Sequence, residues 1–302
     1  MTGSEPAIDM MELADLAQPS KLAWEIHRQL RLQYGKVPPR VPLEGIAQAV
    51  GIVAIDEFET DRFEGTLVIH EGKGAIGLRK GLVRGRRNFT LGHELGHFLN
   101  PWHHGVRSKF ECSKSAIKAQ RAAGFAQRPP LERIEVEANE FSAALLVPVP
   151  EFRERRKTLG ADVDLAHIRA LAQHFDVSQE FMARLYVDQA DVKIAVIHSQ
   201  KGVVKNLTIP AGFPYLGLSR GALIPRASLT HEFRRLHGEG TVSMLRDLPT
   251  SSWLEERGSV TGLYEQVMLQ REGWATTLLM VDEDDDEDEA DDRNWNRRNL
   301  AR

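Results

Sequence analysis

The first hundred residues alternate between helical and strand-like patterns of apolar side chains. Residues 21–34 place apolar side chains three or four positions apart, and residues 43–50 repeat the pattern before Gly51. This spacing puts the apolar side chains on one face of a helix, and a glycine after the last turn commonly ends one. We expect an amphipathic helix in each stretch, preceded by a flexible N-terminus over residues 1–20.

Three short apolar runs follow the second helix. They cover residues 52–55, 67–69 and 75–78, and the Glu-Gly-Lys-Gly sequence over residues 71–74 has the composition of a hairpin turn. The runs predict a small sheet. Its edge strand could hold an extended peptide through main-chain hydrogen bonds.

The last third of the chain mixes strand and helix patterns. Two pairs of apolar runs are each joined by a short turn and flank one helical stretch; they are residues 192–197 with 203–209, residues 263–270 with 274–281, and the helix at 228–236. The sequence therefore predicts a C-terminal α+β domain over residues 191–281. It contains no phosphate-binding loop and no cluster of metal-ligating residue types.

The net charge of −4 belongs to the C-terminal end. Residues 282–292 include ten acidic side chains in eleven positions, and the chain before residue 282 carries 35 basic and 33 acidic side chains. An acidic stretch with almost no apolar residues cannot bury enough surface to fold. We expect residues 282–302 to form a disordered acidic tail on a nearly neutral body.

Three features indicate a cytoplasmic protein. The chain has one cysteine, so it can form no internal disulfide, and no apolar run reaches 18 residues. Residues 1–20 lack the basic-then-apolar pattern of a signal peptide. The single cysteine, Cys112, lies in a charged stretch that has no clear period. We interpret it as a free thiol in a loop, without a role.

The strongest chemical signal is the H-E-x-x-H motif His93-Glu94-Leu95-Gly96-His97. On a helix, positions i and i+4 share a face, so His93 and His97 can reach one metal ion. Glu94 is then placed to accept a proton from a metal-activated water, as a catalytic base. Two imidazoles and a carboxylate with an open position form the usual catalytic zinc site. We expect one Zn²⁺ per chain, with Mn²⁺ as an alternative.

A third protein ligand is expected from residues 134–148, whose apolar positions predict a helix with one buried face. Glu135 and Asn139 are four positions apart and share another face. Glu135 could therefore reach the metal, with Asn139 supporting a ligand from behind. Glu137 is two positions from Glu135, so we expect it to point elsewhere as a solvated or structural charge.

His103 competes with Glu135 for this role. Its spacing after His97 resembles the extended metzincin motif, but the first methionine that follows is Met182, inside a predicted helix. We favour Glu135. Residues 100–130 are expected to form a long loop beside the cleft, from which His103 or His104 could steady a substrate carbonyl.

Four ordered motifs together resemble the ImmA/IrrE family of metallo-endopeptidases. Residues 41–52 and 63–67 resemble its first helix and strands, residues 87–97 resemble its R-x-F-T-x-A-H-E-x-x-H motif with glycine at position 92, and residues 135–148 resemble its E-x-x-A-N-x-F-A-x-x-L-L-x-P helix. The resemblance covers residues 21–150. It implies a zincin-like fold, a glutamate ligand at Glu135, and an intracellular zinc protease that cleaves a helix-turn-helix repressor.

Residues 165–187 have the spacing of a helix-turn-helix, with Ala172 as the small residue of the first helix and Asp176 at the turn position usually held by glycine. The second helix offers only Arg184 as a cation. DNA affinity depends on neutralising phosphates. We therefore expect this pair to pack against the protease core or to dock substrate, without direct DNA binding.

The predicted fold is α+β. Its expected parts are a zincin-like metallopeptidase domain (21–150), a helix-turn-helix-like segment (151–190) and a C-terminal α+β domain (191–281) that resembles, by position and strand content, the GAF-like sensor domain of radiation-response members of the family. The predicted function is zinc-dependent hydrolysis of a peptide bond in a helix-turn-helix repressor during a stress or mobile-element response. The alternative is a non-catalytic metal-binding or DNA-binding transcriptional regulator. No membrane partner is expected.

Overall fold

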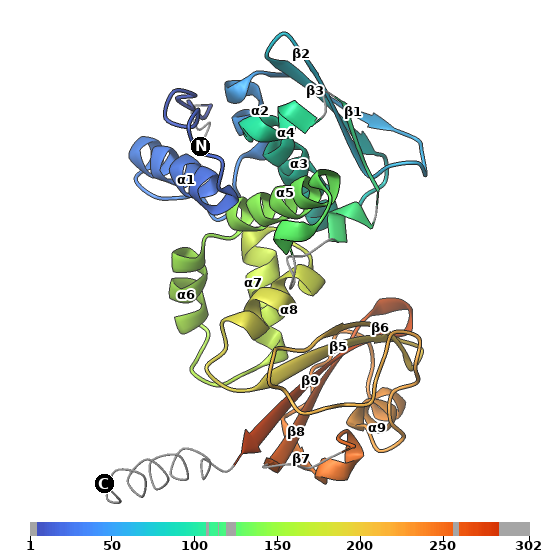
Figure 1. Ribbon diagram of the computed structural model, residues 1–302. Helices are drawn as coiled ribbons and strands as arrows, with labels where there is room; N and C mark the ends of the chain where they lie inside the picture. The colour runs from blue at the N-terminus through green and yellow to red at the C-terminus, as the bar shows by residue number, and fades with distance from the viewer. Residues whose placement is uncertain (1–4, 107–108, 114, 119–124, 256–259, 284–302) are drawn as a thin grey trace, which may run out of the picture. The chain divides into compact units, whose positions relative to one another are not determined.

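The computed structural model describes residues 5–106, 109–113, 115–118, 125–255 and 260–283 (Figure 1). The chain divides into two compact units, one of residues 1–161 with 171–178 and one of residues 162–170 with 179–302. Each unit combines helices with a sheet, which confirms the α+β class. The described helices are all too short or too polar to cross a membrane.

The two N-terminal helices form where the apolar period predicts them. They are α1 (Pro19–Tyr34) and α2 (Leu43–Val50). Gly35 and Gly51, at φ 77° and 108°, adopt the left-handed conformation that ends each helix without a Cβ penalty. The flexible N-terminus is a wrong prediction for residues 5–18. Leu13 is buried, and the Asp9 amide donates to Gln29 Oε1 on α1 at 2.7 Å.

Four described strands form the sheet of the first unit, in the order β1-β3-β2-β4. They are β1 (Ile52–Phe58), β2 (Gly65–His70), β3 (Lys73–Arg79) and β4 (Lys109–Cys112). β2 and β3 make the predicted hairpin, with Glu71 and Gly72 at positive φ in its turn. β4 pairs antiparallel with β2 and places Cys112 opposite Gly65.

The motif helix α3 (Arg84–Leu99) lies between this sheet and α5 (Pro130–Leu146) (Figure 1). Glycines allow α3 and α5 to approach closely: a Cβ on Gly92 would lie 2.6 Å from Ser142 Oγ, and one on Gly96 would lie 3.0 Å from Phe141. The single loop predicted over residues 100–130 is wrong, because α4 (Pro101–Val106), β4 and two short 3-10 helices (Ala116–Lys118 and Phe125–Gln127) occupy most of its described part.

Helices α6 (Val149–Lys157), α7 (Leu165–Phe175) and α8 (Gln179–Asp188) follow. Asp176 has φ 59°, so the predicted left-handed turn residue is confirmed. Within the first unit, this turn packs on the start of α3. Asn88 Nδ2 donates to the Asp176 carbonyl at 2.9 Å, and Arg84 Nε lies 2.5 Å from the Asp176 carboxylate.

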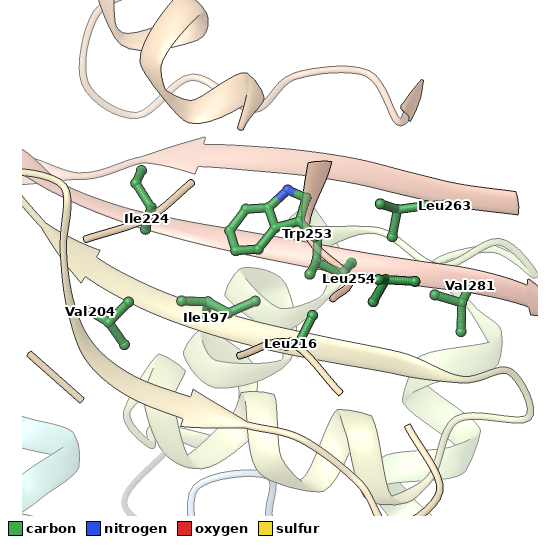
Figure 2. Close-up of a cluster of buried hydrophobic side chains, with 9 residues drawn as sticks. Ile197, Val204, Leu216, Ile224, Trp253, Leu254, Leu263 and Val281 are labelled. Atoms are coloured by element: carbon green, nitrogen blue, oxygen red, sulfur yellow. The ribbon is translucent and has the colours of Figure 1, made fainter. Parts of the chain in front are cut away.

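The second unit contains a five-stranded antiparallel sheet in the order β6-β5-β9-β8-β7. The strands are β5 (Ile194–Gln200), β6 (Val203–Thr208), β7 (Arg246–Leu248), β8 (Val260–Leu269) and β9 (Trp274–Glu283). Helix α9 (Leu229–Leu236) and 3-10 turns at Thr250–Ser252 and Arg271–Gly273 complete the described elements. Figure 2 shows part of the core, in which aliphatic side chains gather around Trp253.

The two C-terminal hairpins are confirmed, whereas β7 and the pairing of β5 with β9 were not predicted. The resemblance of this unit to GAF-like domains stays a prediction. The expected acidic tail begins with Asp282 and Glu283, which belong to β9. Its remaining residues, 284–302, lie outside the described part of the chain.

Candidate metal centre

The H-E-x-x-H residues lie on the buried side of α3, as the helical spacing predicts. The side chains of His93, Glu94 and His97 are fully buried. The Nε2 atoms of the two histidines converge to 3.0 Å, and their rings meet edge to face. Since both Nε2 atoms face one point, the two imidazoles are arranged to share a single cation.

α5 brings Glu135 to the same point. One Glu135 carboxylate oxygen lies 3.3 Å from His93 Nε2, and the other lies 3.7 Å from His97 Nε2. Burial raises the pKa of this carboxyl, but its hydrogen bonds to the two histidines outweigh burial and hold the pKa well below its usual range. Glu135 therefore carries a negative charge that can bind a cation at this point.

Asn139 orients His93, as the i to i+4 spacing from Glu135 predicts. Asn139 Oδ1 lies 2.8 Å from His93 Nδ1, and its amide nitrogen donates to the Ala116 carbonyl at 2.8 Å. Because an amide oxygen only accepts, His93 Nδ1 carries the proton and Nε2 keeps a lone pair toward the cation position. Asn139 thus contacts His93 from the side away from the cation position, where the sequence predicts support for a ligand.

His103 is buried behind His97. Its Nδ1 lies 3.1 Å from His97 Nδ1, and its Nε2 lies 3.2 Å from Glu137 Oε2. Trp102 Nε1 also donates to Glu137 at 2.8 Å. The structure thus places His103 on the ring edge of His97 that faces away from Glu135.

Glu137, expected to be a solvated or structural charge, is a structural one. Burial raises the pKa of its carboxyl, but hydrogen bonds to His103 and Trp102 outweigh burial and lower it. His104 does not approach the cluster, because its Nε2 is bonded to the Phe98 carbonyl at 2.8 Å. The fold of α4, which periodicity did not predict, decides both positions.

Glu94 occupies a buried site beside the cluster. Neither of its carboxylate oxygens has a hydrogen-bond partner among the described residues, and burial raises its pKa to about 7. Gly65 on β2 makes room for it, since a Cβ there would lie 2.2 Å from Glu94 Oε1. An unpaired carboxylate of raised pKa is suited to accept and return a proton.

Cys112 is not in a loop, contrary to expectation. It ends β4, is fully buried, and places Sγ 3.6 Å from His97 Nε2 and 3.9 Å from Glu135 Oε1. Burial and the Glu94 and Glu135 carboxylates raise the pKa of the thiol well above its usual range. No sequence signal showed that β4 would return to this point.

Four donor groups therefore surround one position. One ligand atom from each of His93, His97, Cys112 and Glu135 lies within 4.8 Å of every other. Imidazole nitrogen, carboxylate oxygen and thiolate sulfur are the donors that Zn²⁺ takes in proteins. The group fits a divalent metal ion of this kind.

One comparison with known proteins, the match to a family model, agrees with this chemistry. Residues 53–186 match the family model of the IrrE N-terminal-like domain, a peptidase family, and this match extends through α7 and most of α8. A solved Mycobacterium tuberculosis transcriptional regulator is similar at 14% identity and a TM-score of 0.45, over 89% of this chain and 72% of that chain. The comparison with curated proteins gave no match. The chain therefore contains, over residues 53–186, a metallopeptidase-like IrrE N-terminal-like domain, as its resemblance to the ImmA/IrrE family predicts.

Proposed function

We propose that this protein is a zinc-dependent endopeptidase. The observation that carries the proposal is the convergence of His93 Nε2, His97 Nε2 and the Glu135 carboxylate on one point, next to the unpaired carboxylate of Glu94. His93, His97 and Glu135 would hold the metal, and Glu94 would be the catalytic base. A structural histidine pair would not require a second buried carboxylate without a partner, because such a group is costly to bury.

Each residue has a defined task in peptide hydrolysis. A zinc ion bound here supplies a Lewis acid that activates water and polarises the scissile carbonyl. Glu94 accepts the proton of the attacking water and passes it to the leaving amine nitrogen. Asn139 holds His93, and His103 holds His97, with the Nε2 lone pairs directed at the cation position.

We further propose a protein substrate, a helix-turn-helix transcriptional repressor, cleaved in the cytoplasm during a stress or mobile-element response. The support for this substrate class is the motif resemblance to the ImmA/IrrE family. Packing of the Asp176 turn against α3 supports a structural role for the helix-turn-helix-like segment of this chain, rather than DNA reading.

The test compares wild-type protein with Glu94→Gln on a degenerate peptide library, with cleavage products identified by mass spectrometry. We expect wild type to cleave internal peptide bonds, and Glu94→Gln to lose at least about a hundredfold in rate, the typical contribution of a general base. Zinc content, measured in parallel, should be unchanged in the variant.

Three outcomes are distinguishable. Cleavage retained by Glu94→Gln would remove Glu94 as the base. Zinc binding without any cleavage, by wild type or by Cys112→Ser and with known helix-turn-helix repressors included as substrates, would favour the non-catalytic regulator. Loss of zinc from the variant would mean that Glu94 holds the metal and that a different residue must supply the base.

A further inference from the structure

The metal centre holds one more donor than a peptidase needs. A catalytic zinc site keeps one coordination position open for water or substrate, whereas a structural site fills all four with protein. We propose that Cys112 is a fourth metal ligand, and that β4 is an internal inhibitory strand which keeps the site closed. The proposal rests on the proposed metal site and adds its regulation.

The distances among the four donors fit a closed tetrahedron. Zinc bonds of about 2.0–2.3 Å to nitrogen, oxygen and sulfur place tetrahedral ligand atoms about 3.3–3.6 Å apart. The separations are 3.0 Å between the histidine Nε2 atoms, and 3.3 and 3.7 Å from these to Glu135. Cys112 Sγ lies 3.6 Å from His97 Nε2 and 3.9 Å from Glu135 Oε1, and all four donor atoms are within 4.8 Å of one another. The sulfur is therefore within reach of the position that a catalytic water would otherwise occupy.

Cys112 also lies close to the proposed base, since the Glu94 carboxylate and the Cys112 thiol interact within the buried site. Binding the metal exchanges the thiol proton for the cation and releases the proton to solvent.

β4 is fastened at the place where a substrate strand would lie. It pairs antiparallel with β2 over Lys109–Cys112, and Thr66 Oγ1 donates to the Phe110 carbonyl at 2.6 Å. Phe110 stacks on the His97 ring, with centroids 4.4 Å apart. Without β4, the hydrogen-bonding edge of β2 beside Glu94 would be open to an extended peptide.

β4 is thus in competition with the substrate on two counts. Its main chain occupies the β2 edge, and its cysteine occupies the metal. The strand is four residues long, and Thr66 Oγ1 adds a side-chain bond to its main-chain pairing with β2. β4 therefore lowers peptidase activity, which rises when β4 leaves the site or when Cys112 is modified.

Cobalt substitution tests the ligand directly. Cys112 is the only cysteine, so a thiolate-to-Co²⁺ charge-transfer band in the near ultraviolet can come from no other residue. We expect one Co²⁺ per chain in both wild type and Cys112→Ser, with the band in wild type alone. One bound Co²⁺ without the band would overturn the inference and leave the proposed function intact. No bound Co²⁺ or Zn²⁺ would overturn both.

Acetohydroxamate, a bidentate zinc ligand, tests whether the site is closed. Titrated into the Co²⁺-loaded proteins and followed by the visible cobalt spectrum, it should bind Cys112→Ser at least about tenfold more tightly than wild type, because it no longer competes with a tethered sulfur. Thr66→Val, which removes only the bond to Phe110, should bind it more tightly than wild type as well.

The matched control is Val68→Thr, an exposed substitution on β2 opposite Lys109. It should bind acetohydroxamate like wild type. Circular dichroism melting establishes that each variant is folded. Equal affinities for wild type, Cys112→Ser and Thr66→Val would mean that β4 does not close the site.

Discussion

At the scale of residues, side chains that do not contact the metal position orient the histidines that do. His97 is hydrogen-bonded to His103, His103 to Glu137, and Glu137 to Trp102. Such hydrogen bonds fix the tautomer and the ring orientation of a ligand, and a ligand held in place loses less entropy on binding. His93 has the shorter support of Asn139.

Zinc content should separate Glu135 from His103. We expect Glu135→Ala to lose stoichiometric zinc, since it removes the only carboxylate placed between the two Nε2 atoms within the described site. His103→Ala leaves both Nε2 atoms and Glu135 in place, so it should retain zinc when excess metal is supplied. Elemental analysis after dialysis gives the answer. Zinc lost from His103→Ala and retained by Glu135→Ala would make His103 the third ligand.

The hydrogen bonds that link His103, Glu137 and Trp102 should affect the affinity for zinc rather than the number of zinc ions bound. We expect Glu137→Gln to weaken zinc binding by about 10–100-fold, the usual effect of losing a partner of a ligand. Competition with a chromophoric chelator measures it. Glu132→Gln, an exposed position on the same helix, is the control. An unchanged affinity for Glu137→Gln would reduce the His103–Glu137 pair to simple packing.

At the scale of elements, the site depends on how closely α3 and α5 approach. Gly92 replaces the alanine that is commoner in the family motif, and Ser142 stands where that motif has a second alanine. These two residues lie next to each other in the structure. Ser142 Oγ fills the space beside Gly92 and donates to the Phe89 carbonyl at 2.8 Å. The volume lost on one helix is restored on the other.

This pairing predicts a rescue. Gly92→Ala places a Cβ 2.6 Å from Ser142 Oγ, so we expect it to lower the free energy of unfolding by about 1–3 kcal/mol, as overpacked cores do. Adding Ser142→Ala should recover most of the loss. Chemical denaturation of the four proteins of this double-mutant cycle measures the coupling. Gly105→Ala, where a Cβ meets nothing within 4 Å, is the control. Additive effects would contradict the contact.

At the scale of the whole molecule, charge argues against a role on DNA. The chain before residue 282 is nearly neutral. The one cation of α8, Arg184, is paired with Glu180 at 3.2 Å, and Glu180 also accepts from Asn206. Non-specific DNA affinity comes from neutralised phosphates, and these side chains offer few.

We therefore expect no retardation of duplex DNA in a gel shift at physiological salt, up to about 1 μM protein, which is the strong end of non-specific binding. Repeating the assay at low salt reveals any weak electrostatic binding. Retardation that survives physiological salt would return the helix-turn-helix-like segment to consideration as a DNA reader.

Local patterns determined much of this protein. The helical period predicted α1, α2 and α5, because one apolar face suffices to place such a helix on a core. The motif placed His93, Glu94 and His97 on one helix, and the i to i+4 spacing joined Glu135 to Asn139. These relations depend on residues a few positions apart, where helix geometry alone sets the distance.

Only the tertiary structure decided what meets this helix from elsewhere. Nothing in the pattern of residues 100–130 foretold that α4 would seat His103 behind His97, or that β4 would pair with Gly65 and direct Cys112 to the cluster. The pairing of β5 with β9 and the contacts of residues 5–18 belong to the same class. Such contacts arise because buried polar groups and strand edges pair with groups distant in sequence. The periodicity of the sequence does not show which distant groups these are.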